Sequence, residues 1–312
     1  MAPVPVVDTV KRIFFGRALR SDRLGETLLP KRIALPVFAS DALSSNAYAT
    51  QEILVVLAIG GFSLYSFGPL VAAAVVVLYF VVIASYRQNV HAYPGGGGDY
   101  TVVATNLGPR WGVFTASALL VDYTLTVAVS ISAAVANLGS VFPAIAEHAP
   151  WWAVGIIVII TLVNLRGVRE SGTAFAVPTY LFLLSIGIMV VTGLIRVIAG
   201  DELRAESAGW EIIAQDEVMG LALVFLVARA FSSGTTALTG IEAIANGVPS
   251  FRKPKARNAA TTLLLLGVIS MTMFVSITWL ALTTGVKVTN DPADLVGLPE
   301  GQPQKTVIVQ IA

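Results

Sequence analysis

Seven polar or ionisable residues stand in three apolar segments of this sequence, at spacings that place them on shared helix faces. They are Asp41 and Tyr48 in the first segment, Asp122, Thr126 and Ser130 in the second, and Thr239 and Glu242 in the third. Within each segment the intervals are three, four or seven positions, which bring side chains to one face of an α-helix. Carboxylate and hydroxyl oxygens are ligands for hard cations. The pattern predicts an all-oxygen cation site, provided that the three segments meet.

The first and third segments also carry runs of small polar residues that weaken a helix. Residues 40–48 read SDALSSNAY, and residues 231–236 read FSSGTT. Such residues bond their own backbone in place of the helical ladder. In a membrane they favour a discontinuous helix whose freed carbonyls can hold an ion. We therefore expect helical breaks near Ser44 and near Gly234. An anionic substrate is disfavoured, because Asp41 would repel it.

The same residues also have structural interpretations. A lone serine in a membrane helix commonly bonds the carbonyl four residues earlier, which weakens the case for Ser130. The three carboxylates can instead form a static polar network with Arg229. Glu52 is interpreted as structural, capping or pairing within the first segment.

Composition places these segments in a membrane. The chain has 312 residues, of which 55% are hydrophobic and 12% charged, and its mean hydropathy is +0.78. A soluble domain has roughly 25% charged residues, so an ordinary cytosolic enzyme is excluded. There are no cysteines and two histidines, both expected in loops, and no Ser/His/Asp or HExxH set is present. No enzyme activity, metal cofactor or other cofactor is therefore predicted, and a net charge of +1 gives no case for nucleic acid.

Seven apolar runs are long enough to approach the roughly 20 residues that a bilayer requires. They cover about 33–60, 66–86, 112–142, 151–166, 174–199, 217–248 and 259–286. Lys and Arg residues gather in the N-terminal segment and in the loops after the second, fourth and sixth runs. Because cytoplasmic loops carry an excess of these residues, we expect a multi-pass plasma-membrane protein with a cytoplasmic N-terminus.

Three regions follow from this topology. Residues 1–32 form a basic cytoplasmic segment, in which 6–24 reads as a basic amphipathic helix or an ordinary solvated tail. Residues 33–288 form the transmembrane domain. Residues 289–312 are polar and then turn apolar at Thr306, as an external segment that leads to an eighth span. A seven-span protein with a short external tail is the alternative.

Several strings of residues resemble one family of permeases. Residues 94–112 (PGGGGDYTVVATNLGPRWG) and 240–259 (GIEAIANGVPSFRKPKARNA) resemble loops of the amino acid–polyamine–organocation (APC) superfamily. Residues 38–54 (FASDALSSNAYATQEIL), 119–132 (LLVDYTLTVAVSIS) and 236–244 (TALTGIEAI) resemble the KUP-type potassium uptake permeases, in their bacterial KimA-like branch.

This resemblance implies an all-α, LeuT-type inverted-repeat fold with broken helices 1 and 6, here truncated to about seven spans. It implies import of potassium with protons. It also implies a homodimer through a C-terminal part that lies outside this chain, and a gating role for the glycine-rich loop. The implied potassium ligands are Asp41, Tyr48, Asp122, Thr126, Thr239 and Glu242, with weaker support for Ser130.

Proton coupling follows from the charge of such a site. Three carboxylates that lie close together cannot all ionise cheaply, so one should retain a proton near neutral pH. We assign that proton to Glu242. Two other functions stay open, namely an amino-acid or polyamine permease of the same superfamily and a partial, non-transporting fragment. Affinity, stoichiometry and regulation are not predicted.

Overall fold

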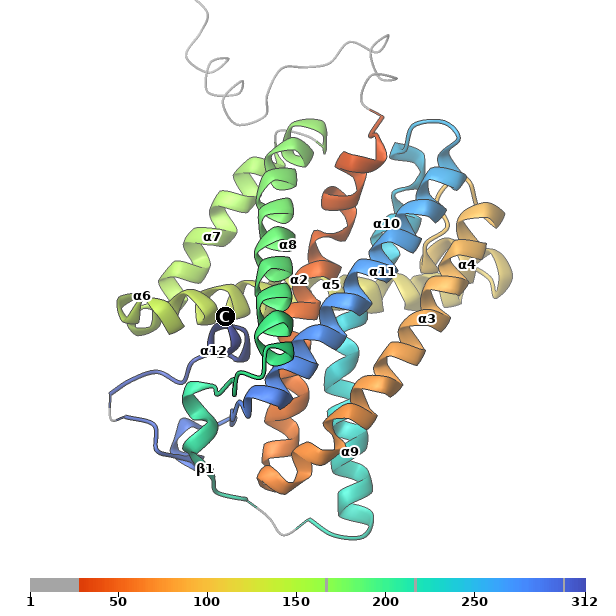
Figure 1. Cartoon of the computed structure of the whole chain (residues 1–312). Coiled ribbons are helices and arrows are strands. Elements are labelled where there is room, and N and C mark those ends of the chain that lie inside the picture. Colours follow the sequence, from red (N-terminus) through yellow and green to blue (C-terminus); the bar gives the residue numbers. More distant parts are fainter. Residues whose placement is uncertain (1–27, 166–167, 216–217, 300) are drawn as a thin grey trace, which may run out of the picture.

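The computed structural model describes residues 28–165, 168–215, 218–299 and 301–312, and it is almost entirely helical (Figure 1). The expected amphipathic segment 6–24 lies outside these residues. The helices, in chain order, are α2 (Lys31–Ala58), α3 (Gly68–Ala92), α4 (Asp99–Asn106), α5 (Pro109–Val141), α6 (Pro143–Glu147), α7 (Ala149–Asn164), α8 (Val168–Ile198), α9 (Leu221–Gly234), α10 (Glu242–Asn246), α11 (Lys255–Thr284) and α12 (Val307–Ile311). Two short strands, β1 (Glu211–Ile212) and β2 (Leu295–Val296), pair antiparallel.

Several of these helices are suited to a membrane. Five segments are long and apolar enough to cross one, namely Phe62–Ala92, Pro109–Val141, Phe175–Ile198, Leu221–Asn246 and Lys255–Thr284. α7 is apolar but has only 16 residues. α2 has 28 residues but does not meet the same test of composition, because polar residues continue through its middle. The chain is thus a multi-pass membrane protein, with five candidate spans among the described residues. The expected total of seven stays a prediction that depends on α2 and α7.

α2 is the central helix of the bundle. It packs against α8, α9, α11 and the 3₁₀ turn η4 (Thr235–Leu238), and Figure 1 shows it between α8 and α3. Its buried residues include the small side chains of Ala39, Ala42 and Ala49. Small side chains let helix backbones approach closely, which is how helices associate in lipid.

The expected break in α2 near Ser44 is absent, which corrects that prediction. The helix runs without interruption from Lys31 to Ala58. Ser44 Oγ donates to the carbonyl of Asp41 at 2.9 Å, and Asn46 Nδ2 donates to that of Ala42 at 2.5 Å. The small polar side chains therefore add second bonds to carbonyls of an intact helix and do not displace the helical ladder.

The second expected break, near Gly234, is present. α9 ends at Gly234, η4 follows, and Thr239 has an extended backbone with ψ 143°. Gly240 then adopts φ +81°, and α10 begins at Glu242. Such an interruption takes backbone groups out of the regular helical ladder, so that they can bond side chains or ions. The carbonyl of Thr236, for example, accepts a bond from Thr239 Oγ1 at 2.9 Å.

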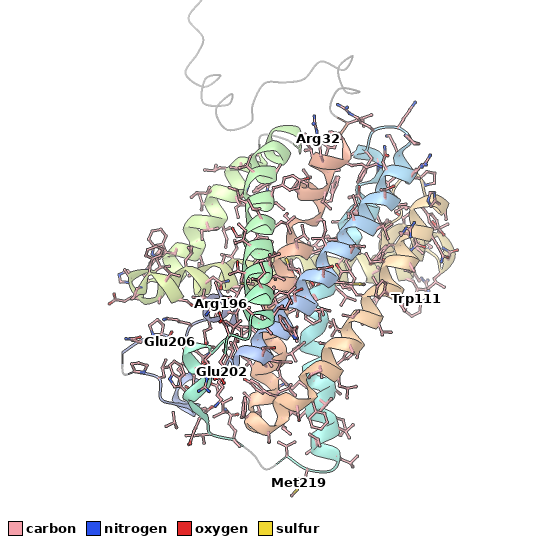
Figure 2. All side chains as sticks on the ribbon, in the orientation of Figure 1. Arg32, Trp111, Arg196, Glu202, Glu206 and Met219 are labelled. Carbon is pink, nitrogen blue, oxygen red and sulfur yellow. The ribbon has the colours of Figure 1, made fainter. Side chains whose placement is uncertain are left out.

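The two ends of the bundle differ in the charged residues that they carry. Arg32 lies at the end where α2 begins, and Glu202 and Glu206 lie towards the opposite end (Figure 2). There Arg196 pairs with Asp201 at 3.1 Å, and both side chains are exposed. The distribution agrees with the expected excess of basic residues on one side, while the orientation in the membrane stays a prediction.

Candidate functional site

A chain of hydroxyl groups joins the middle of α2 to the interruption after α9. Ser45 Oγ lies 2.9 Å from Tyr48 Oη and 2.9 Å from Thr239 Oγ1. Ser45 is fully buried and Tyr48 nearly so. Thr239 Oγ1 also donates to the carbonyl of Thr236 at 2.9 Å. Two of the expected ligands, Tyr48 and Thr239, are therefore held together through a serine that lies between them.

The same chain reaches α5 and ends on a carboxylate. Ser130 Oγ donates to Asp41 Oδ1 at 3.2 Å and lies 3.4 Å from Tyr48 Oη. Ser130 thus bridges the two expected ligands on α2, so its place in the group is better supported than its isolated position in the sequence indicated. Asp41, Tyr48, Ser130 and Thr239 form one connected polar cluster drawn from α2, α5 and the interruption.

Gly240 brings the interruption into direct contact with Asp41. A Cβ atom at Gly240 would lie 2.7 Å from Asp41 Oδ2 and 3.1 Å from the backbone nitrogen of Ala42. Together with its positive φ, this leaves glycine as the residue that fits without strain. The backbone between α9 and α10 therefore passes immediately beside the carboxylate.

Glu242 begins α10 and is buried, with 7% of its surface exposed. Its Oε1 atom has no hydrogen-bond partner among the described residues. Asp122, Asp99 and Asp41 all act on it electrostatically, and Asp122 acts on Asp41 in the same way. The three expected carboxylates therefore influence one another electrostatically, and Asp99 at the start of α4 adds a further negative charge near Glu242.

Asp122 and Thr126 are expected ligands that are not hydrogen-bonded to the polar cluster. Both are half-buried on α5, and no hydrogen bond joins either side chain to another described group. Within the described ranges, no three acidic or histidine side chains lie close enough to form a metal centre. The carboxylates thus act on one another electrostatically without forming a compact group of ligands within the described ranges.

Ser45 is the group that the residue pattern missed. It is the only described residue bonded to both Tyr48 and Thr239. Its position was available from the sequence, because it lies four residues after Asp41 and three before Tyr48, on the same helix face.

The static network with Arg229 finds no support in the described part of the chain. Arg229 is exposed on α9. None of the ion pairs between described residues includes it, and those pairs lie near one end of the bundle. The buried carboxylates therefore have no arginine partner there.

The glycine-rich loop packs against the end of α10. The N–H of Gly97 donates to the carbonyl of Ala245 at 3.0 Å. At Gly98 a Cβ atom would lie only 1.6 Å from Oδ1 of Asn246, and Asn246 in turn donates to Tyr123 Oη of α5 at 3.2 Å. α4 follows directly after this loop. The loop thus contacts the half-helix that carries Glu242, as a gating role would require.

A cavity between α2 and α5 adjoins the cluster at Tyr48. It has a volume of about 410 Å³ and includes Tyr48 and Glu52 of α2, Asn137 of α5, and Thr306 in its lining. Tyr48 is the one expected ligand that it reaches. The tyrosine therefore separates this cavity from the rest of the cluster.

Gly240→Ala tests the contact between the interruption and Asp41. The positive φ costs an L-residue about 1–2 kcal/mol, and the added methyl group collides with Asp41 and the α2 backbone. We expect a lower melting temperature in detergent. Gly187→Ala in α8 is the matched control, since no atom lies within 4 Å of its Cβ position. Equal stability of the two variants would contradict the close packing described here.

Comparison with known proteins assigns the family. A family model described as "Amino acid permease" matches residues 35–298. The potassium transporter KimA of Bacillus subtilis (strain 168) is 39% identical over 304 residues, which cover 97% of this chain and 47% of KimA. The chain therefore spans about half the length of this curated relative. Because the family model covers most of the chain, including every residue of the cluster, the chain belongs to the amino acid permease family.

Proposed function

We propose that this chain is the substrate-binding part of a secondary transporter that imports potassium together with protons across the plasma membrane. Its fold would be of the LeuT type, with the N-terminus in the cytoplasm. The observation that carries the proposal is the polar cluster in which Asp41 is bonded to Ser130 and linked through Tyr48 and Ser45 to Thr239. The similarity to KimA, whose name states potassium transport, supports the choice of ion.

The composition of the cluster favours a monovalent alkali ion. Hydroxyl oxygens of Tyr48, Ser130 and Thr239 and carbonyls of the interruption can replace the hydration shell of the ion, as such oxygens do in selective cation sites. Thr126, which lies outside the cluster, stays a predicted further ligand. Asp41 offsets its charge. A single nearby carboxylate suits one positive charge, whereas divalent cations need several carboxylates in one shell.

Glu242 is suited to carry the proton. It is buried, its Oε1 atom has no hydrogen-bond partner among the described groups, and three other carboxylates, those of Asp122, Asp99 and Asp41, act on it electrostatically. Ionising all three groups in a low-dielectric region is costly, so proton binding at one of them and potassium entry would favour each other. We assign the two events to neighbouring groups, with potassium at the Asp41 cluster and the proton at Glu242.

An amino-acid or polyamine permease is the second candidate, because the matching family model bears the description of an amino acid permease. A cationic amine would also be attracted by Asp41 and Glu242. The absence of a cationic partner for these groups in the described part of the chain disfavours a substrate with a carboxylate, which would meet two like charges.

Uptake into proteoliposomes separates the candidates. The full-length protein would be reconstituted and given labelled rubidium, an amino-acid mixture or a polyamine, each with and without an inward proton gradient. We expect rubidium to accumulate, faster with the gradient, and unlabelled potassium to compete with it. Accumulation of an amino acid or polyamine that potassium does not inhibit would reject the potassium proposal.

A further inference from the structure

Glu52 is the one charged side chain that lines the cavity between α2 and α5. It is half-buried, and no ion pair or hydrogen bond joins it to any residue that the structure describes. A carboxylate within a membrane bundle is costly unless it faces a partner or an aqueous space. The cavity, with a volume of about 410 Å³, supplies that space. The structural role expected for Glu52, capping or pairing within α2, therefore has no contact to support it.

The other polar groups of the cavity are already engaged. Gln51 Oε1 accepts the N–H of Val307 at 2.9 Å, and Asn137 Oδ1 accepts from Thr306 Oγ1 at 2.6 Å. These two bonds attach the start of α12 to α2 and to α5. They contribute no charge, so Glu52 is the one group of the cavity lining that can present a negative charge to whatever enters the cavity.

The position of Glu52 relates it to the central cluster. It lies four residues after Tyr48 on a continuous helix, so the two side chains share a face. Both line the cavity, and Glu52 acts electrostatically on Tyr48. A cation attracted by Glu52 would therefore stand one helical turn from the hydroxyl chain that leads to Asp41.

We propose that Glu52 forms an outer cation position, at which a potassium-sized monovalent ion is held before it passes Tyr48. This proposal extends the proposed function, and it adds a second, weaker binding position to the central one. A single carboxylate with neutral oxygens around it attracts a monovalent ion and cannot supply the six to eight oxygen ligands, several of them charged, that Ca²⁺ takes. Its effect is to raise the local cation concentration.

The charge of the cavity can be measured without transport. Ser132 lines the cavity, and this chain has no cysteine, so Ser132→Cys in an otherwise cysteine-free full-length protein places one thiol there. We expect a cationic methanethiosulfonate to react roughly tenfold faster than an anionic one, as expected for a focused negative field. Glu52→Gln should bring the two rates close together, and rubidium should slow the reaction in the parent but not in Glu52→Gln.

The matched control is Glu147→Gln. Glu147 is exposed in α6 and does not line this cavity, so its loss should leave the ratio of rates unchanged. Equal rates in the parent, or a ratio that Glu52→Gln does not change, would overturn the proposal. These readouts remain valid if the protein proves to carry no rubidium, so failure of the proposed function is distinguishable from failure of this inference.

Rubidium kinetics give the second test. Glu52→Gln should raise the half-saturating rubidium concentration by roughly five- to tenfold through loss of local attraction, with a maximal rate within about twofold of the parent. Glu52→Asp keeps the charge, so its half-saturating rubidium concentration should lie close to that of the parent. A lower maximal rate at unchanged half-saturation would show that Glu52 supports the helix instead, and the outer position would be rejected.

Discussion

Asp41→Asn is expected to abolish rubidium uptake and potassium-dependent growth in the full-length protein while leaving its amount in the membrane unchanged. The substitution keeps the shape and the bond from Ser130 but removes the charge beside the interruption. Removing one partner of a buried ion pair costs roughly 3–5 kcal/mol, which is more than about a hundredfold in affinity. Direct rubidium binding to purified protein is the primary measurement.

Asp201→Asn is the matched control, because Asp201 is an exposed acid that pairs with Arg196 away from the cluster. It should retain normal uptake. Asp122→Asn should resemble Asp41→Asn, although with partial binding, because Asp122 acts on the cluster only through its field. Growth at limiting potassium by both Asp41→Asn and Asp122→Asn would show that these carboxylates are structural.

Glu242→Gln is expected to separate binding from coupling. Glutamine mimics the protonated carboxyl permanently, so the cluster around Asp41 should still bind rubidium with an affinity within about tenfold of the parent. An inward proton gradient should no longer drive accumulation, because the group that carries the proton cannot release it. Proteoliposome uptake with and without the gradient measures both properties.

The pH dependence of the parent gives the accompanying check. Uptake should rise as the external pH falls, because protonation of Glu242 removes excess negative charge from the site. It should decline again once protonation reaches Asp41 and Asp122 and displaces potassium. Glu242→Gln should lose the rising part and keep the decline. A proton gradient that drives Glu242→Gln as strongly as the parent would place the proton on another group.

Five of the seven expected spans correspond to long apolar segments of the structure, because helical periodicity and hydropathy are local properties. The candidate ligands stay predictions. Asp122, Thr126 and Ser130 share a face of α5 because of their spacing, whichever helices pack against that face. The break after Gly234 could also be predicted, since its small polar residues adjoin Gly240, which adopts a conformation that other residues rarely take.

Only the tertiary structure decided which of these local features meet. Ser44 and Asn46 predicted a break in α2, yet dense packing by neighbouring helices keeps that helix continuous and turns their side chains back to its own carbonyls. Ser45 became the link between α2 and Thr239 because the interruption passes beside it. Arg229 is exposed, and no ion pair between described residues joins it to the carboxylates. Periodicity assigns a residue to a face of its helix, but the packing of the other helices determines what that face contacts.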